Sequence, residues 1–265
     1  MGMVRSPAVA GMFYPADPRE LHNMVVDLLQ EADSSEEIPK ALIAPHAGYI
    51  YSGPIAATAY APLVRARGIY KRVVLLGPSH RVGFTGLALS SAAFFVTPLG
   101  KIALDPSARE TLADLPQVRV LDQAHLQEHS LEVHLPFLQE VLGKFTLIPL
   151  VVGDADPESV AEVLEQLWGG PETLIVISSD LSHYHDYATA RRLDAATSHA
   201  IEDLMPEAIH HEHACGRNPI NGLLTIARRY KMSARTLDLR NSGDTAGPRD
   251  RVVGYGAYTF LSAPT

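Results

Sequence analysis

The chain has 265 residues, of which 46% are hydrophobic and 20% charged, and these values are typical of a globular fold rather than a disordered chain. Its formal net charge of −8 would repel a phosphate backbone, so we expect no nucleic-acid partner. The single cysteine excludes an intramolecular disulfide, no apolar run is long enough to span a membrane and no signal segment opens the sequence, which together predict a cytoplasmic protein.

Short apolar runs alternate with segments of helical periodicity along the whole chain. We predict strands at 41–44, 72–76, 87–90, 94–96, 146–152, 172–178, 233–239 and 252–261. We predict helices at 19–31, 53–61, 106–112, 126–142, 157–167, 188–204 and 219–230, with a kink or break at Pro136. This order predicts a single α/β domain over residues 1–265, with a central, mostly parallel or mixed β-sheet flanked by helices.

Three of the predicted buried strands are followed by polar, titratable residues. The strand at 41–44 leads to His46, the strand at 72–76 leads to His80, and the strand at 172–178 leads to Asp180 and His183. Sites in open α/β sheets form beyond the carboxyl ends of the strands, so we expect these side chains to meet at one edge. Two histidines in similar, proline-containing turns favour a metal site over turn histidines that bind only backbone groups.

A third metal ligand must come from elsewhere in the chain. Asp244 lies in the turn-rich segment 240–247 and is one candidate, although a loop aspartate often caps backbone amides instead. Two histidines and a carboxylate leave positions open for substrate or dioxygen, an arrangement typical of non-haem Fe(II) oxygenases. Cys215 is the other candidate because histidines precede it, although a lone cysteine is more often a small buried apolar group.

Further histidines are candidates for proton transfer. A histidine next to a carboxylate suits acid–base chemistry, which favours His183 with Asp180, although Asp180 could instead cap the following helix. On the predicted helix 126–142, His129 and Glu132 share one face while His134 points elsewhere. We therefore expect His129 to enter the site and Glu132 or His134 to brace it.

The segment that contains His129 also matches the inverted zinc-peptidase motif H-x-x-E-H. In that motif His125 and His129 would bind zinc one helical turn apart, and Glu128 would act as the base. So short a match arises easily by chance in a chain with 12 histidines, and it leaves His46 and His80 without a role. A zinc peptidase is therefore an alternative hypothesis.

Taken together, these motifs make the sequence resemble the Memo family over nearly its whole length. The segments that carry the resemblance are 7–15 (PAVAGMFYP), 45–53 (PHAGYIYSG), 77–80 (GPSH), 128–136 (EHSLEVHLP), 178–183 (SSDLSH), 215–220 (CGRNPI), 241–244 (NSGD) and 253–255 (VGY). In combination they are far more specific than any one of them alone.

The resemblance implies a fold like that of the class III extradiol dioxygenases, which cleave catechol rings with Fe(II). It implies that His46 and His80 bind the metal. It also implies that Asp180, His129 and His183 line the pocket, with His183 matching the acid–base histidine of the dioxygenases.

The third ligand is where the sequence departs from the family pattern. Animal members place a cysteine ligand in the late loop, where this chain has residues 241–245, and Cys215 matches a different cysteine of the family. Asp244 is therefore expected to replace the thiolate by a carboxylate, which favours Fe(II) and leaves copper or zinc as alternatives.

Family resemblance alone does not fix an activity, because one fold hosts many functions. The first hypothesis is a non-haem Fe(II)-dependent oxidoreductase that acts on a small, catechol-like substrate. The alternatives are a non-catalytic iron- or copper-binding protein, for example a partner of a radical S-adenosylmethionine enzyme, and a peptide-binding module that uses the pocket without metal.

Overall fold

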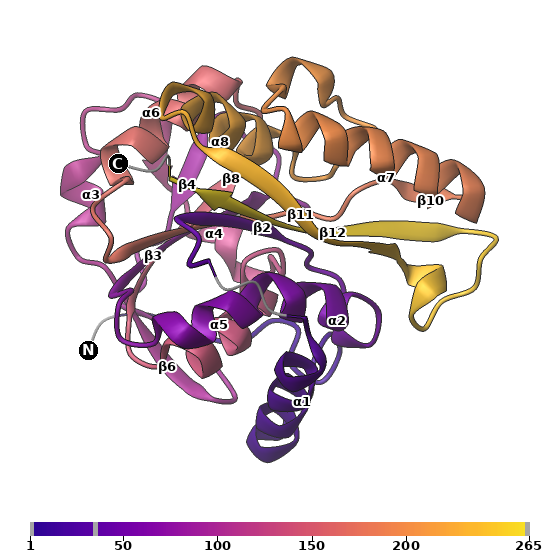
Figure 1. Ribbon diagram of the computed structural model, residues 1–265. Coiled ribbons are helices and arrows are strands. Elements are labelled where there is room, and N and C mark those ends of the chain that lie inside the picture. Colours follow the sequence, from indigo (N-terminus) through magenta and orange to yellow (C-terminus); the bar gives the residue numbers. More distant parts are fainter. Residues whose placement is uncertain (1–2, 34–36, 263–265) are drawn as a thin grey trace.

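The computed structural model describes residues 3–33 and 37–262, and these form one twelve-stranded mixed sheet covered by helices (Figure 1). The strands are β1 (Val4–Arg5), β2 (Ala41–Ala44), β3 (Arg72–Pro78), β4 (Leu87–Leu89), β5 (Phe94–Thr97), β6 (Gly100–Leu104), β7 (Val118–Val120), β8 (Thr146–Val152), β9 (Thr173–Ser178), β10 (His183–His185), β11 (Ser233–Asn241) and β12 (Val252–Leu261). The α-helices are α1 (Pro18–Glu31), α2 (Tyr49–Tyr60), α3 (Ala108–Thr111), α4 (Asp122–Leu126), α5 (Leu135–Leu142), α6 (Pro157–Leu167), α7 (Tyr187–Glu202) and α8 (Arg217–Arg229). Short 3-10 helices are η1 (Ala61–Ala66), η2 (Glu132–His134), η3 (Pro206–Ala208) and η4 (Ser242–Asp244).

The centre of the sheet is parallel. Strands β6, β8, β3, β9 and β2 lie side by side in that order with parallel pairing, and β12 continues the sheet antiparallel to β2. Every residue of β2 and β9 is buried, as expected for parallel strands covered on both faces. The carboxyl ends of β2, β3 and β9 therefore meet at one edge of the sheet.

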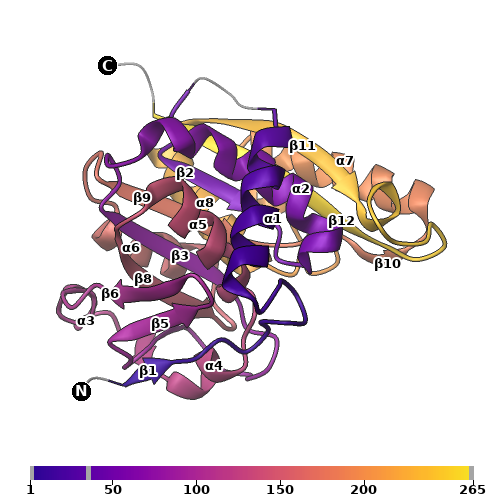
Figure 2. The same ribbon diagram turned by 90° about the horizontal axis from the view of Figure 1, so that it is seen from below.

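Helices cover both faces of this sheet, as two perpendicular views show (Figures 1 and 2). Helices α1, α2 and α5 lie on one face, and α6, α7 and α8 lie on the other. Successive strand residues alternate between two cores: Leu42 and Val176 belong to the first, and Ile43 and Ile175 to the second. No helix in the described part of the chain is long and apolar enough to cross a membrane.

The structure confirms the predicted α/β class, and most predicted elements agree with it to within a few residues. The single helix predicted at 126–142 is wrong, because α4 ends at Leu126 and α5 begins at Leu135. In between, the carboxylate of Glu128 accepts hydrogen bonds from the backbone N–H groups of His129 and Ser130, which holds this segment in a turn. The break thus comes well before Pro136, which lies in the first turn of α5 where its missing N–H costs nothing.

Close packing of α6 against α8 yields the first prediction. A Cβ atom added to Gly222 of α8 would lie 2.3 Å from Cγ1 and 2.4 Å from Cβ of Val160, so the helices would have to separate. We expect Gly222→Ala to lower the free energy of unfolding by about 1–3 kcal/mol in urea denaturation, as overpacking does. Gly83 has nothing within 4 Å of an added Cβ, so Gly83→Ala is the control. Equal stabilities of the two variants would contradict the prediction.

Candidate metal centre

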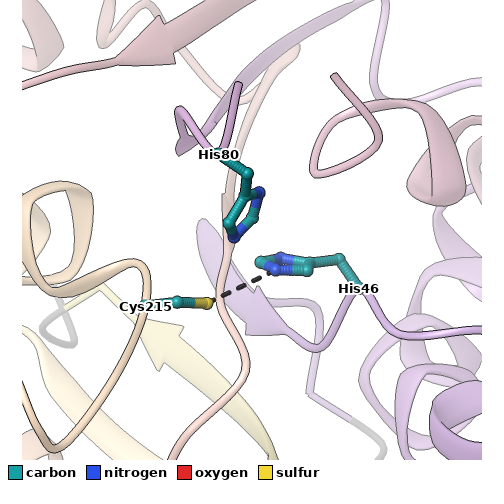
Figure 3. A group of neighbouring side chains, drawn as sticks. All are labelled: His46, His80 and Cys215. Carbon is teal, nitrogen blue, oxygen red and sulfur yellow. Dashed lines mark hydrogen bonds between the residues drawn. The ribbon is translucent and has the colours of Figure 1, made fainter. Parts of the chain in front are cut away.

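Three possible metal donors converge at the carboxyl edge of the parallel strands. His46 follows β2, His80 follows β3, and Cys215 precedes α8 from a loop more than a hundred residues later. Their donor atoms all lie within 4.8 Å of one another, and Cys215 Sγ is 3.4 Å from His46 Nε2. Figure 3 shows the three side chains pointing toward a common centre from three separate segments.

Hydrogen bonds fix the orientation of the His46 ring. Its Nδ1 lies 2.6 Å from Ser178 Oγ, and this hydroxyl in turn donates to the carbonyl oxygen of Ser130. Because the hydroxyl has a single proton to donate, it accepts a hydrogen bond from Nδ1–H of His46. The Nε2 atom is left with its lone pair facing Cys215, which is the state that binds a metal ion.

A buried carboxylate orients His80 in the same way. Oε1 of Glu128 accepts from Nδ1 of His80 at 2.9 Å, and Oε2 accepts from the His80 backbone N–H at 2.6 Å. Burial opposes ionisation of Glu128, but the hydrogen bonds from His80 and the backbone outweigh it and hold the carboxyl pKa at about 2. A carboxylate behind a ligating histidine fixes its tautomer, so the Nε2 atom of His80 is the one available to a metal.

Cys215 is held beside the histidines by backbone contacts. Its N–H donates to the carbonyl oxygen of Asp180 at 3.2 Å, and its Sγ accepts from the backbone N–H of Asp180 at 3.3 Å. Burial raises the pKa of the thiol, so a metal ion would have to displace the thiol proton on binding. A Cβ added to Gly216 would lie 2.6 Å from the carbonyl oxygen of Ser178. This close approach explains the Cys-Gly pair, a signal that the sequence analysis did not use.

The donors line an open cavity of about 940 Å³. Other residues in its wall are Phe13, Tyr51, Arg81, His129, His183 and Tyr255. The His129 ring stacks on the His80 ring with centroids 4.7 Å apart, and it meets the His46 ring edge-on at 5.4 Å. Burial lowers the pKa of His129 to about 4, so this ring is neutral near pH 7. The structure thus brings His129 to the site, as the sequence predicted.

Asp180 and His183 also lie where the sequence placed them, in the wall of this cavity. Oδ1 of Asp180 accepts a hydrogen bond from the His46 backbone N–H at 2.7 Å. Burial raises the pKa of the Asp180 carboxyl to about 7, although hydrogen bonds from the backbone lower it in part. Asp180 does not cap the next helix, because Asp186 does so at the start of α7. Burial also lowers the pKa of His183, although the backbone of Leu181 acts in the opposite direction.

Asp244, the expected third ligand, does not join the two histidines. Its carboxylate accepts from the backbone N–H of Asn241 at 3.0 Å and from the hydroxyl of Tyr187 at 2.5 Å. It therefore caps the short helix η4, which was the alternative considered for it, and it is absent from the cavity wall. The donor beside His46 and His80 is Cys215, so the expectation of a carboxylate in that position is corrected.

The zinc-peptidase alternative finds no support in the arrangement of its residues. The His125 side chain is buried and its Nε2 donates to the carbonyl oxygen of Ala88 at 2.9 Å. The second group of metal-ligand types among the described residues joins Glu128 and His129 with His80, not with His125. Glu128 already accepts four hydrogen bonds from protein N–H groups, so it orients His80 rather than acting as a base.

Of the two residues considered as braces of the site, Glu132 has contacts that lead to it and His134 does not. The carboxylate of Glu132 is buried and accepts from the hydroxyl of Tyr14 at 2.6 Å, from the backbone of Ala8 and Val9, and from the guanidinium of Arg5. His134 Nδ1 lies 2.8 Å from the hydroxyl of Tyr60, away from the cavity. Through these contacts Glu132 holds the N-terminal arm, residues 5–14, against the loop that carries His129. Phe13 of this arm contacts the His129 ring, with the two ring centroids 4.8 Å apart.

Comparison with known proteins assigns the chain to a family. A family model described as Memo-like protein matches residues 5–259. The chain belongs to the Memo family. A MEMO1 family protein from Aquifex aeolicus is 38% identical over 270 residues, covering 97% of this chain and 99% of the relative. A MEMO1 family protein from Aeropyrum pernix is 37% identical over 281 residues, covering 96% of this chain and 98% of the relative.

A solved structure shows that the fold also occurs outside close sequence similarity. The uncharacterized protein JW3007 from Escherichia coli K12 matches 82% of this Memo-family chain and 99% of its own chain with a TM-score of 0.52. At 12% sequence identity this likeness concerns the fold alone.

The buried His125 predicts a pH dependence of stability. Burial lowers its pKa from 6.5 to about 4, so the unfolded chain binds this proton at a higher pH than the folded chain. Stability is therefore lost as the pH falls through this interval. Gln lacks the titration, so the destabilisation by His125→Gln should shrink by roughly 2–3 kcal/mol between about pH 7 and about pH 4.5 in urea denaturation. The exposed His199→Gln is the control, and a pH-independent effect of His125→Gln would refute the prediction.

Proposed function

We propose that this Memo-family protein binds one redox-active first-row metal ion, iron or copper, and uses it to oxidise a small, catechol-like molecule with dioxygen as the oxidant. The observation that carries the proposal is the convergence of His46, His80 and Cys215 in the wall of an open cavity. Three protein donors leave positions on the ion free for substrate, which is typical of catalytic rather than structural metal sites.

The donor set decides which ions fit. Imidazole nitrogens suit iron, copper and zinc, and a thiolate suits softer ions such as Cu(I) better than a carboxylate does. The preference for Fe(II) derived from the sequence depended on Asp244, and it loses that reason with Cys215 in the third position. Iron and copper are therefore both admitted, whereas zinc fits the donors but has no redox chemistry.

When bound, a redox-active ion at these donors would exchange electrons with the substrate and hold its oxygen atoms. The residues of the chain supply binding and proton transfer. The His183 ring lines the cavity and is held neutral by burial, so it can accept a proton from a phenol oxygen. His129 stacks on His80 and closes the wall beside the donors.

Metal analysis of the purified protein tests the donor set. We expect close to one iron or copper ion per chain in the wild type, and loss of that ion in His46→Ala and in Cys215→Ala, because each removes one donor. Asp244→Asn is the matched control and should retain the ion, since Asp244 caps η4. Loss in Asp244→Asn with retention in Cys215→Ala would reverse the assignment, and zinc alone would overturn the redox part.

Oxygen uptake by the metal-loaded protein, with catechol as the probe, tests the role of His183. We expect His183→Gln to lower kcat by about 10²–10⁴-fold, the usual effect of losing a general base, with the metal content unchanged. His199→Gln, an exposed position on α7, should behave as the wild type. An unchanged kcat in His183→Gln would remove that residue from the proposal. Absence of any uptake by the wild type would favour a metal-binding partner protein, for example of a radical S-adenosylmethionine enzyme.

A further inference from the structure

The rim of the cavity carries two positively charged side chains, although the chain as a whole is acidic. Arg81 and Arg251 both line the cavity and are exposed, although the net charge of the chain is −8. Neither guanidinium has an ion pair or a hydrogen bond to any residue within the ranges 3–33 and 37–262. The other arginine of the same late loop, Arg249, differs in this respect, since its guanidinium lies 3.9 Å from the carboxylate of Asp244.

An aromatic ring holds Arg251 in place without using its hydrogen-bond donors. The guanidinium carbon of Arg251 lies 5.2 Å from the centroid of the Tyr184 ring, in a cation–π contact. Stacking of this kind fixes the plane of the guanidinium and leaves its N–H groups free for a carboxylate, which it can bind through two parallel hydrogen bonds.

The backbone is distorted at the residue that provides this ring. Tyr184 adopts φ +63°, in the left-handed region that residues other than glycine rarely occupy. The pairing of β10 with β12 shifts its register between His183 and His185, so Tyr184 is the extra residue of a bulge. Bulges redirect side chains, and here the bulge leaves Tyr184 65% exposed in the cavity wall rather than in the sheet.

We infer that the cavity takes a small aromatic molecule with a carboxylate group, and that Arg251 on Tyr184 is the residue that selects for this charge. The inference rests on the proposed function, in which the ion held by His46, His80 and Cys215 would bind the substrate's phenol oxygens. Tyr51, Tyr184 and Tyr255 supply aromatic wall for the ring, and Arg81 adds a second positive charge on the His80 side of the cavity.

The charged side chains around the cavity support the same inference. The cavity wall also holds the carboxylates of Asp180 and Glu212, but Asp180 is buried against the backbone of His46. Glu212 is exposed at the rim, and the backbone and three neighbouring histidines lower its pKa. Two free guanidinium groups therefore give an incoming anion a local attraction on a chain whose net charge is −8.

Two ligands of nearly equal shape test this inference. We would titrate 3,4-dihydroxybenzoate and its neutral analogue 3,4-dihydroxybenzamide into the anaerobic, metal-loaded protein and measure both Kd values by calorimetry. We expect the carboxylate to bind at least about 10-fold more tightly than the amide, as charge-assisted hydrogen bonds do. This preference should weaken as the salt concentration rises, because the rim is exposed.

Variants then locate the source of the preference. Arg251→Gln should bring the two Kd values within about 2-fold of each other by removing the charge-assisted bonds, while the Kd of the amide stays near its wild-type value. Arg249→Gln is the matched control. Arg249 is two residues before Arg251 and its guanidinium carbon lies 4.5 Å from the centroid of the Tyr187 ring, but it is not part of the cavity wall. It should keep the wild-type preference. Arg81→Gln should reduce the preference less than Arg251→Gln.

The results separate this inference from the function on which it rests. Equal binding of both ligands to the wild type, or an undiminished preference in Arg251→Gln, would overturn the inference and leave the metal centre intact. Binding of neither ligand to protein that holds its metal ion would overturn the inference together with the proposed substrate class.

Discussion

A carboxylate that is removed from water must be satisfied by hydrogen bonds, and the geometry of this site depends on how Glu128 meets that requirement. Its two oxygens accept from the ring and the backbone of His80 and from the backbone of His129 and Ser130. One buried group thus ends the helical path after α4, sets the tautomer of His80, a candidate metal ligand, and positions the ring stacked on it. Local backbone structure and the geometry of the candidate metal centre are coupled through this single side chain.

The parallel centre of the sheet provides the second constraint. Because β2, β3 and β9 run in the same direction, the residues that follow them meet at one edge, and Ser178 at the end of β9 can hold the His46 ring that follows β2. Cys215 lies in the loop before α8, which covers the face of the sheet opposite to α2. The glycine after Cys215 allows this loop to approach Ser178 closely. The donor set therefore requires both the strand register and the packing of α8 on the sheet.

The cavity differs in character from its surroundings. Its inner wall includes His46, His129 and His183, whose pKa values burial lowers, and neutral imidazoles suit metal binding and proton acceptance. Its rim carries Arg81 and Arg251, although the molecule as a whole is acidic. The N-terminal arm, which is hydrogen-bonded to Glu132, contributes Phe13 to one side of the cavity. These features are those that the proposed oxidation of a small anion would need.

The sequence by itself determined the fold class, the family and most of the site. Apolar runs of strand length that are followed by His46, His80 and Asp180 predicted both the layered sheet and the edge at which these side chains meet, because that pattern depends only on burial and chain direction. Which side chain lies beside the two histidines as a candidate third donor was decided by the tertiary structure. Asp244 and Cys215 were both reasonable ligands by chemistry, and only long-range packing places Cys215 3.4 Å from His46 while the hydrogen bonds of η4 retain Asp244. The role of Glu128 was also decided by the tertiary structure. The sequence pattern placed Glu128 in a helix and did not indicate that its carboxylate binds a histidine 48 residues earlier in the chain.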